Sequence, residues 1–222
     1  MTVARVATFN IRHGLGRDDV IDLHRTAATI LEAHPDLLAL QEVDVGMRRS
    51  GRVDQAAALG ELTGLRMSFR PTLSRGEGRF GLAIGAAAEL EPRLELLPRL
   101  EEDEERRGAL VVTWGGRVVI ATHLSLRART RAEQMRAVAD MAGRHGAVIV
   151  TGDLNQQEGG LGPLFEAGFD PGPDRPTTLR TRLGRRRFDF VLAGGGARVR
   201  AAAAVDLGAS DHSLVVAEVE LA

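Results

Sequence analysis

The sequence predicts a single α/β domain. Short apolar runs suited to β-strands alternate with segments whose apolar residues recur at helical spacing, and this alternation is typical of α/β folds. The chain has 222 residues, 44% of them hydrophobic, so it can bury a sizeable core. No internal repeat or low-complexity linker interrupts the pattern. We therefore expect one domain over residues 1–222.

The apolar runs and the helical segments can be placed in order along the chain. The predicted strands are Val3–Ile11, Leu37–Gln41, Leu82–Ala86, Ala109–Trp114, Val118–Thr122, Ala147–Thr151, Phe188–Leu192 and Ser213–Leu221. The predicted helices are Val20–Ala33, Val53–Leu62 and Thr130–Gly143. In the first helix we expect Ile21, Ala28 and Leu31 to form the buried stripe, and Pro35 to follow its end.

Composition limits the chemistry. The chain has no cysteine, which excludes disulfides, thiolate metal sites and cysteine nucleophiles and leaves oxygen and imidazole as metal ligands. The 29 basic residues are balanced by 30 acidic ones, so the basic excess usual in nucleic-acid-binding domains is missing. The N-terminus lacks the features of a signal peptide, and no run approaches the ~20 apolar residues of a membrane span. We expect a cytoplasmic protein without stable membrane insertion.

Polar residues lie at the ends of four of the predicted strands or just beyond them. These residues are Asn10, Glu42, His123 and Asp153. Taken alone, each one is better explained by a turn, a cap or a strand-end residue with a local partner. Asn155, Asp189, Asp211 and His212 add further polar side chains of the same kinds. Together these residues indicate an active site at one edge of the fold, because ligand sites in α/β folds gather where strand ends open onto loops.

These residues lie in motifs that resemble the endonuclease/exonuclease/phosphatase superfamily. The motifs are Thr8-Phe9-Asn10, Leu40-Gln41-Glu42-Val43, Arg107-Gly108-Ala109-Leu110, Thr122-His123-Leu124, Gly152-Asp153-Leu154-Asn155, Phe188-Asp189-Phe190 and Ser210-Asp211-His212-Ser213. The superfamily includes nucleases, abasic-site endonucleases, sphingomyelinases and inositol-polyphosphate phosphatases. The resemblance implies a four-layer α/β sandwich, in which two mainly antiparallel β-sheets pack face to face and are flanked by helices.

The resemblance also implies a metal site. Glu42 would be the principal ligand of Mg²⁺ or Mn²⁺, assisted by Asn10, and Asp211 would complete or approach the site; carboxylate and amide oxygens suit these ions. One position departs from the pattern of abasic-site endonucleases, which tend to carry a further metal-associated Asp where this chain has Arg12.

The resemblance assigns the catalytic roles to the remaining motif residues. Asp153 would orient or deprotonate the attacking water, and Asn155 would hold Asp153 and a phosphate oxygen. His212, held by Asp189, would donate to a non-bridging oxygen as charge builds up, and His123 would supply a second donor. The acidic residue that often supports the first histidine is replaced by Arg79 here, which leaves Glu77 as the nearest acidic residue in the sequence.

An arginine cluster precedes the Phe188-Asp189-Phe190 strand. It consists of Arg180, Arg182, Arg185, Arg186 and Arg187. A solvated hairpin loop explains the cluster equally well. If Asp189 lies at the site, Arg185, Arg186 and Arg187 would border the same cleft and bind substrate phosphates beyond the scissile one.

Two classes of function stay open at this point. The favoured one is a Mg²⁺-dependent phosphoester hydrolase of the phosphodiesterase, nuclease or phosphatase type, acting as a monomer on a small molecule or a nucleic acid. The alternative is a non-catalytic phosphate- or nucleic-acid-binding module that keeps the fold. The polar residues present at every motif favour the enzyme, and the near-neutral charge slightly favours a small soluble or single-nucleotide-like phosphoester.

Overall fold

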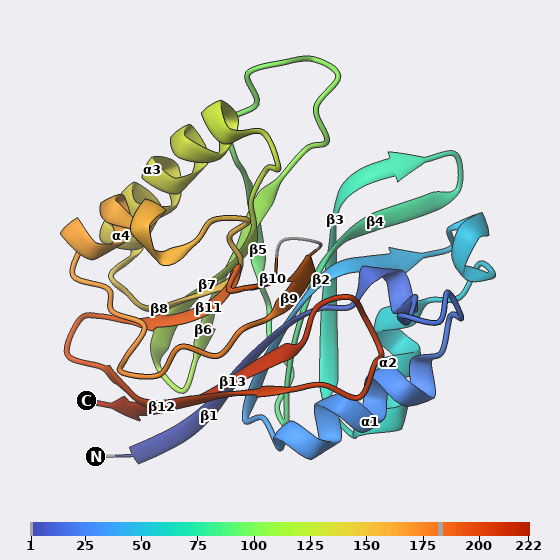
Figure 1. The fold of residues 1–222 in the computed structure, drawn as a ribbon, viewed down its shortest axis with the longest axis horizontal. Helices are drawn as coiled ribbons and strands as arrows, with labels where there is room; N and C mark the ends of the chain where they lie inside the picture. Colours follow the sequence, from blue (N-terminus) through green and yellow to red (C-terminus); the bar gives the residue numbers. More distant parts are fainter. Residues whose placement is uncertain (1, 182–183) are drawn as a thin grey trace.

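The computed structural model describes residues 2–181 and 184–222. Two β-sheets lie one against the other, and the two ends of the chain lie near each other at the same edge of the molecule (Figure 1). In the described part of the chain, no helix is long and apolar enough to cross a membrane.

The first sheet has six strands in the order β12-β13-β1-β2-β4-β3. Its strands are β1 (Thr2–Asn10), β2 (Leu37–Val45), β3 (Arg66–Arg75), β4 (Gly78–Ala86), β12 (Arg198–Val205) and β13 (Leu214–Leu221). All neighbouring pairs are antiparallel except β1 and β2, which run parallel.

The second sheet has five strands in the order β11-β8-β7-β6-β5. Its strands are β5 (Arg93–Leu96), β6 (Gly108–Trp114), β7 (Arg117–His123), β8 (Ala147–Asp153) and β11 (Asp189–Ala193). Here β7 and β8 form the parallel pair. A separate hairpin is formed by β9 (Leu179–Thr181) and β10 (Gly184–Arg186), which pair antiparallel.

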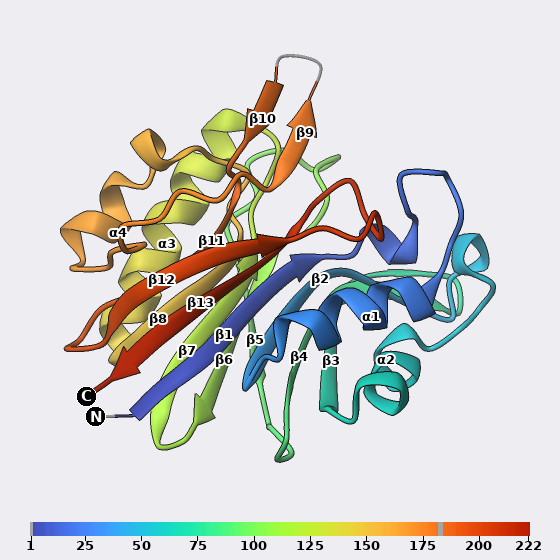
Figure 2. The ribbon, with the colours of Figure 1, turned by 60° about the horizontal axis from the view of Figure 1, so that its bottom comes forward.

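Helices cover the outer faces of both sheets, which confirms the expected four-layer sandwich (Figures 1 and 2). The helical elements are α1 (Leu23–Ala33), α2 (Gln55–Thr63), α3 (Ala128–His145), α4 (Gly162–Glu166) and the 3-10 turns η1 (Arg12–Gly14), η2 (Arg48–Ser50) and η3 (Glu158–Gly160). One apolar cluster lies between the sheets, a second between the first sheet and α1 and α2, and a third between the second sheet and α3 and α4.

The two parallel pairs position the polar strand ends. A parallel pair needs a crossover connection, which α1 supplies between β1 and β2 and α3 supplies between β7 and β8. The carboxyl ends of both pairs therefore open at one edge of the sandwich. In the registers, Asn10 lies opposite Gln41, and His123 lies opposite Asp153.

All eight predicted strands and all three predicted helices exist, with shifted bounds. The pattern missed β3, β5 and β12, which are edge strands of their sheets, as well as the small β9–β10 hairpin. An edge strand lacks a neighbour on one side, and its alternation is weaker because more of its side chains reach solvent. The strand β12, for example, is largely exposed and alanine-rich.

The expected buried stripe of the first helix was wrong by about one residue. Leu31 is 46% exposed and Ile21 lies before the helix, whereas Ala27, Ile30 and Ala33 are buried. Asp22 caps the helix by accepting a hydrogen bond from the backbone of Arg25, and this cap sets where the helix begins. The helix α3 also runs past the expected end at Gly143 and ends at His145.

Candidate active site

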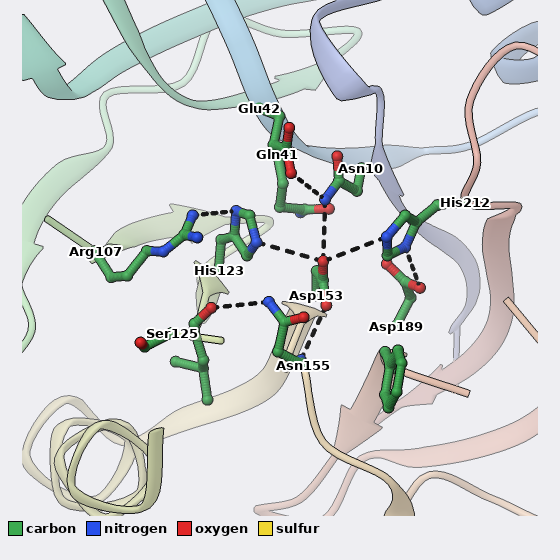
Figure 3. Close-up of polar contacts among 12 residues, drawn as sticks. Asn10, Gln41, Glu42, Arg107, His123, Ser125, Asp153, Asn155, Asp189 and His212 are labelled. Carbon is green, nitrogen blue, oxygen red and sulfur yellow. Dashed lines mark hydrogen bonds and ion pairs between the residues drawn. The ribbon is translucent and has the colours of Figure 1, made fainter. Parts of the chain in front are cut away.

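Asn10, Glu42 and Asp153 meet where β1, β2 and β8 come together (Figure 3). The side-chain amide nitrogen of Asn10 donates to Glu42 Oε1 at 2.9 Å and to Asp153 Oδ2 at 3.0 Å. Asn10 Oδ1 accepts a hydrogen bond from the backbone of Arg12, which fixes the orientation of the amide. Asn10 thus links one carboxylate from each sheet across 143 residues of sequence.

A β-bulge in β2 accompanies the contact of Glu42 with Asn10. The pairing of β2 with β4 shifts register between Leu40 and Val43, and Glu42 has a φ of +59°, in the left-handed region that is costly for a residue with a side chain. Gln41 is instead fully buried and exchanges hydrogen bonds with Thr8. The bulge re-aims one side chain of the pair, as bulges near functional sites often do.

Asp153 is buried at the centre of the cluster, with 1% of its surface exposed. Its Oδ1 accepts the backbone N–H of Asn155 at 2.9 Å, and the Asn155 side chain donates to the carbonyl of Leu124. Asn155 thus holds Asp153, as expected, but through its main chain. The preceding residue must be glycine, because a Cβ on Gly152 would lie 1.9 Å from the carbonyl oxygen of Thr122.

Asp189 and His212 form the hydrogen bond that the resemblance implied. His212 Nδ1 lies 2.9 Å from Asp189 Oδ2, and its Nε2 lies 3.8 Å from Asp153 Oδ2. The hydroxyl of Thr178 accepts the backbone N–H of Asp189, which fixes the strand behind the carboxylate. The other oxygen of Asp189 is buried without a hydrogen-bond partner among the described residues.

The structure supplies a support for His123 that sequence reasoning did not find. Arg107 Nη1 lies 2.8 Å from His123 Nδ1, and a guanidinium can only donate. Nδ1 therefore accepts, and the ring carries its proton on Nε2, which lies 3.4 Å from Asp153 Oδ2. Glu77 does not take this role, since it is an exposed partner of Arg52.

The position of Arg107 explains why it was missed. It comes directly before β6, in the motif Arg107-Gly108-Ala109-Leu110, to which no catalytic role was assigned from the sequence. Arg107 also pairs with Glu105 at 2.8 Å. The available signal was the arginine beside Gly108 at the start of a strand that pairs with β7.

The two imidazoles have opposite protonation states near neutral pH. Burial lowers the pKa of His123 well below its ordinary value, and the positive charges of Arg107 and His212 lower it further. Burial alone would also lower the pKa of His212, but the negative charges of Asp189 and Asp153 outweigh burial and raise it to about 10. His123 is thus a neutral donor, and His212 is a cationic one.

The pKa of Asp153 is raised to about 7, chiefly by burial and then by the charge of Asp189. A carboxylate with a pKa near neutrality suits a general base, because it is both ionised and basic enough to accept a proton. The three donors that face its Oδ2 come from Asn10, His123 and His212. The arrangement therefore offers one base and several donors to a tetrahedral anion.

The donor set fits a hard divalent cation. Asp153, Asp189 and His212 offer ligand atoms within 4.8 Å of one another, but His212 and Asp189 are already joined by their hydrogen bond. Glu42 is half-buried, and among the described residues only Asn10 bonds to its side chain, through one oxygen. The second oxygen of Glu42 is thus available to an ion such as Mg²⁺ or Mn²⁺.

Two expected metal ligands have other contacts. Asp211 is half-exposed, accepts from Ser210 Oγ at 3.3 Å and lies 4.0 Å from Arg12 Nε. Asn10 turns its nitrogen, not its oxygen, toward the carboxylates. In this structure Glu42 is therefore the member of the expected set with a carboxylate oxygen that accepts no hydrogen bond from the described residues.

The arginines of the predicted cluster have different surroundings in the structure. Arg185 is exposed and Arg186 half-exposed on β10, and Leu179 of β9 forms a bridge with His212, so the hairpin borders the site. Arg187 contradicts the expectation: it is 8% exposed and packs 4.4 Å from the ring centre of Phe190. Arg182 and the side chain of Arg180 lie outside the described residues.

A family model described as the endonuclease/exonuclease/phosphatase family matches residues 7–212. No curated protein sequence matches the chain. The solved structure of an endonuclease/exonuclease/phosphatase from Bacteroides vulgatus is similar with a TM-score of 0.76 and 16% identity, covering 100% of both chains. One from Beutenbergia cavernae gives a TM-score of 0.74 and 23% identity, covering 100% of this chain and 72% of the other.

A third similar structure comes with a ligand. It is TDP2 from D. rerio complexed with a single-strand DNA product, which gives a TM-score of 0.71 and 17% identity and covers 100% of both chains. At these identities the structural likeness shows the fold, and the matched family model covers nearly the whole chain.

Proposed function

Because the chain belongs to the endonuclease/exonuclease/phosphatase family, we propose that it is a Mg²⁺- or Mn²⁺-dependent phosphoester hydrolase. The observation that carries the proposal is the buried Asp153 carboxylate, faced by a neutral and a cationic imidazole and linked through Asn10 to Glu42. We further propose that residues 1–222 form one domain and that the protein is a cytoplasmic monomer.

Each residue of the site has its own role in the proposed reaction. Asp153 accepts a proton from the attacking water, and Asn155 fixes the carboxylate through its backbone N–H. His212, oriented by Asp189, and His123, oriented by Arg107, donate to the non-bridging oxygens on which charge accumulates. The rate enhancement thus comes from aligning the water with the phosphate and from stabilising the charge on the phosphate oxygens, since the protein forms no covalent bond to the phosphoryl group.

Glu42 would hold the metal ion, with Asn10 orienting its carboxylate and with Asp211, next to His212 in the chain, as the further expected ligand. A bound ion of this kind neutralises charge on the phosphate oxygens and helps to orient the substrate. Asn10 connects the proposed metal ligand to the proposed base, because its side-chain amide donates to both Glu42 and Asp153.

The alternative of a non-catalytic binding module is less well supported. A phosphate-binding site needs donors, but it has no need for a buried carboxylate whose negative charge opposes the anion. The solved TDP2 complex with single-strand DNA product supports a nucleic acid among the candidate substrates, and Arg185 and Arg186 are the proposed contacts beyond the scissile phosphate.

A substrate panel with Mg²⁺ tests the proposal. The panel contains an aryl phosphodiester, an aryl phosphomonoester, single-stranded and duplex DNA, an abasic duplex, sphingomyelin and inositol phosphates. We expect turnover of at least one class by the wild type, and none by Asp153→Asn. Binding without turnover of any member, by a correctly folded wild type loaded with metal, would favour the binding module instead.

Replacing Arg107 with methionine tests how His123 is oriented. The change removes the donor to Nδ1, so the ring is no longer fixed with its proton on Nε2 and one phosphate donor is lost. We expect kcat to fall by about 10²-fold, the range for loss of one such donor, with a smaller change in KM. Nitrogen NMR of the histidine ring should show a changed tautomer.

The matched control for this change is Arg106→Met at the neighbouring exposed position. It should retain wild-type kcat and leave the His123 tautomer unchanged. If Arg107→Met kept both the tautomer and full turnover, Arg107 would have no orienting role.

A further inference from the structure

A cavity lined by arginines lies outside the catalytic cluster, at the end of the first sheet where β2 leads into η2. It is a cavity of about 580 Å³ at the end of β2 and the β3–β4 turn, and its arginines are Arg48, Arg49, Arg52 and Arg75. We call this cavity the arginine pocket. Figure 1 shows η2 and the β3–β4 hairpin extending together on the side of the molecule away from α3.

Arg49 is held in place within the arginine pocket. Its Nε and Nη2 donate to both oxygens of Asp44 at 2.9 and 2.8 Å, and Asp44 is fully buried. Ser50 Oγ also donates to Asp44, and the guanidinium stacks 5.2 Å from the ring centre of Phe80. The third nitrogen, Nη1, takes no part in these hydrogen bonds, so Arg49 is preorganised with a donor left for a ligand.

The other three arginines leave the arginine pocket with excess positive charge. Arg52 lies 3.6 Å from Glu77, but that carboxylate is 93% exposed, so the pair contributes little. Among the described residues, the side chains of Arg48 and Arg75 have no hydrogen-bond or ion-pair partner. Four guanidinium groups thus face two carboxylates, and guanidinium forks match phosphate oxygens closely.

The arginine pocket lies within reach of a substrate bound at the catalytic site. It begins at Gly46, four residues beyond Glu42 on β2, which corresponds to at most roughly 13 Å at the rise of a strand. Asp44, which binds the guanidinium of Arg49, lies two residues after Glu42 on β2, so Arg49 is anchored to the strand that carries Glu42.

We propose that the arginine pocket binds a second phosphate group of the substrate, on the side of the catalytic site where β2 carries Glu42. The inference rests on the proposed function and specifies its substrate: a phosphoester that carries further phosphates, either along a nucleic-acid strand or on a small polyphosphorylated molecule. A singly charged phosphodiester is then too small to occupy both sites.

The test uses the double variant Arg52→Gln, Arg75→Gln, which changes two exposed side chains outside the catalytic cluster. The matched control is Arg136→Gln, Arg198→Gln, which removes the same charge from α3 and β12. Binding of a fluorescent single-stranded oligonucleotide and of inorganic tripolyphosphate is measured in chelator, so that neither metal binding nor hydrolysis contributes.

We expect the pocket variant to raise the Kd for the oligonucleotide about tenfold, and the control to leave it near the wild-type value. The slope of log Kd against log salt should fall by about 0.7 for each phosphate that the variant no longer neutralises. A weakening shared by tripolyphosphate supports small polyphosphorylated ligands, and a weakening confined to the oligonucleotide supports a nucleic-acid strand.

Equal effects of the pocket and control variants on both ligands would overturn the proposal. The kinetic arm separates this failure from failure of the proposed function. Turnover of an aryl phosphodiester with Mg²⁺ reports on the catalytic site alone, and the pocket variant should leave its kcat/KM nearly unchanged. Absent turnover with intact pocket binding would instead count against the hydrolase.

Discussion

Glu42→Gln should lower turnover by at least about 10²-fold while the protein keeps its fold. Groups that merely orient a metal ligand typically contribute 10- to 100-fold to metal affinity or activity, so loss of a direct ligand should cost no less. Glutamine retains the volume of the side chain and an oxygen that accepts from Asn10. The change therefore removes the charge that attracts the ion without opening a gap.

Kinetics at increasing Mg²⁺ and a calorimetric metal titration measure this effect. The wild type should lose activity in chelator and regain it with Mg²⁺ or Mn²⁺, whereas Glu42→Gln should need far more metal. The control Glu133→Gln alters a carboxylate on α3 that pairs with Arg136, and it should behave as the wild type. A folded Glu42→Gln protein with full activity at low Mg²⁺ would remove Glu42 from the metal site.

Asp189→Asn should lower kcat by about 10²-fold or more, with a smaller change in KM, because general acid–base and donor residues contribute on this scale. The carboxylate of Asp189 is fully buried and bonds to His212 Nδ1 at 2.9 Å. Without its charge, His212 loses both its fixed orientation and the main attraction that keeps it protonated. The variant should bind substrate but stabilise the transition state poorly.

A double-mutant cycle with His212→Ala shows whether the two residues act as one unit. If they do, the double variant should be little slower than the slower single variant, since removing either residue already disables the pair. Multiplicative losses would instead mean that Asp189 and His212 contribute separately. Thermal unfolding of each variant verifies that the loss concerns kcat and not the fold.

The positions of the strand ends were predictable because periodicity and strand termination are local properties. The runs before Asn10, His123 and Asp153 are apolar enough to be strands in any context, and a polar residue ends each one. The order of the motifs then gave the four-layer fold by resemblance. Edge strands such as β3 and β12 were missed because their side chains meet solvent, which weakens the apolar alternation on which such predictions depend.

The contacts of the arginines could not be predicted in this way. The chain carries 29 basic residues, and nothing local distinguishes Arg107, which orients His123, from Arg187, which packs over Phe190, or Arg49, which is fixed by Asp44. A guanidinium on a long side chain reaches partners on other strands. Its role is therefore decided by which segments the fold places beside it.

Composition and local patterns were enough to predict the α/β fold class, to exclude cysteine chemistry and to name the kinds of side chain at the site. The geometry of the site required the folded chain, because the site joins segments as far apart as Asn10 and Asp153, from two different sheets. The neutral state of His123 and the cationic state of His212 likewise depend on burial and on neighbouring charges. These properties arise only when the two sheets have packed together and buried the side chains of Asp153, Asp189 and His123 at their common edge.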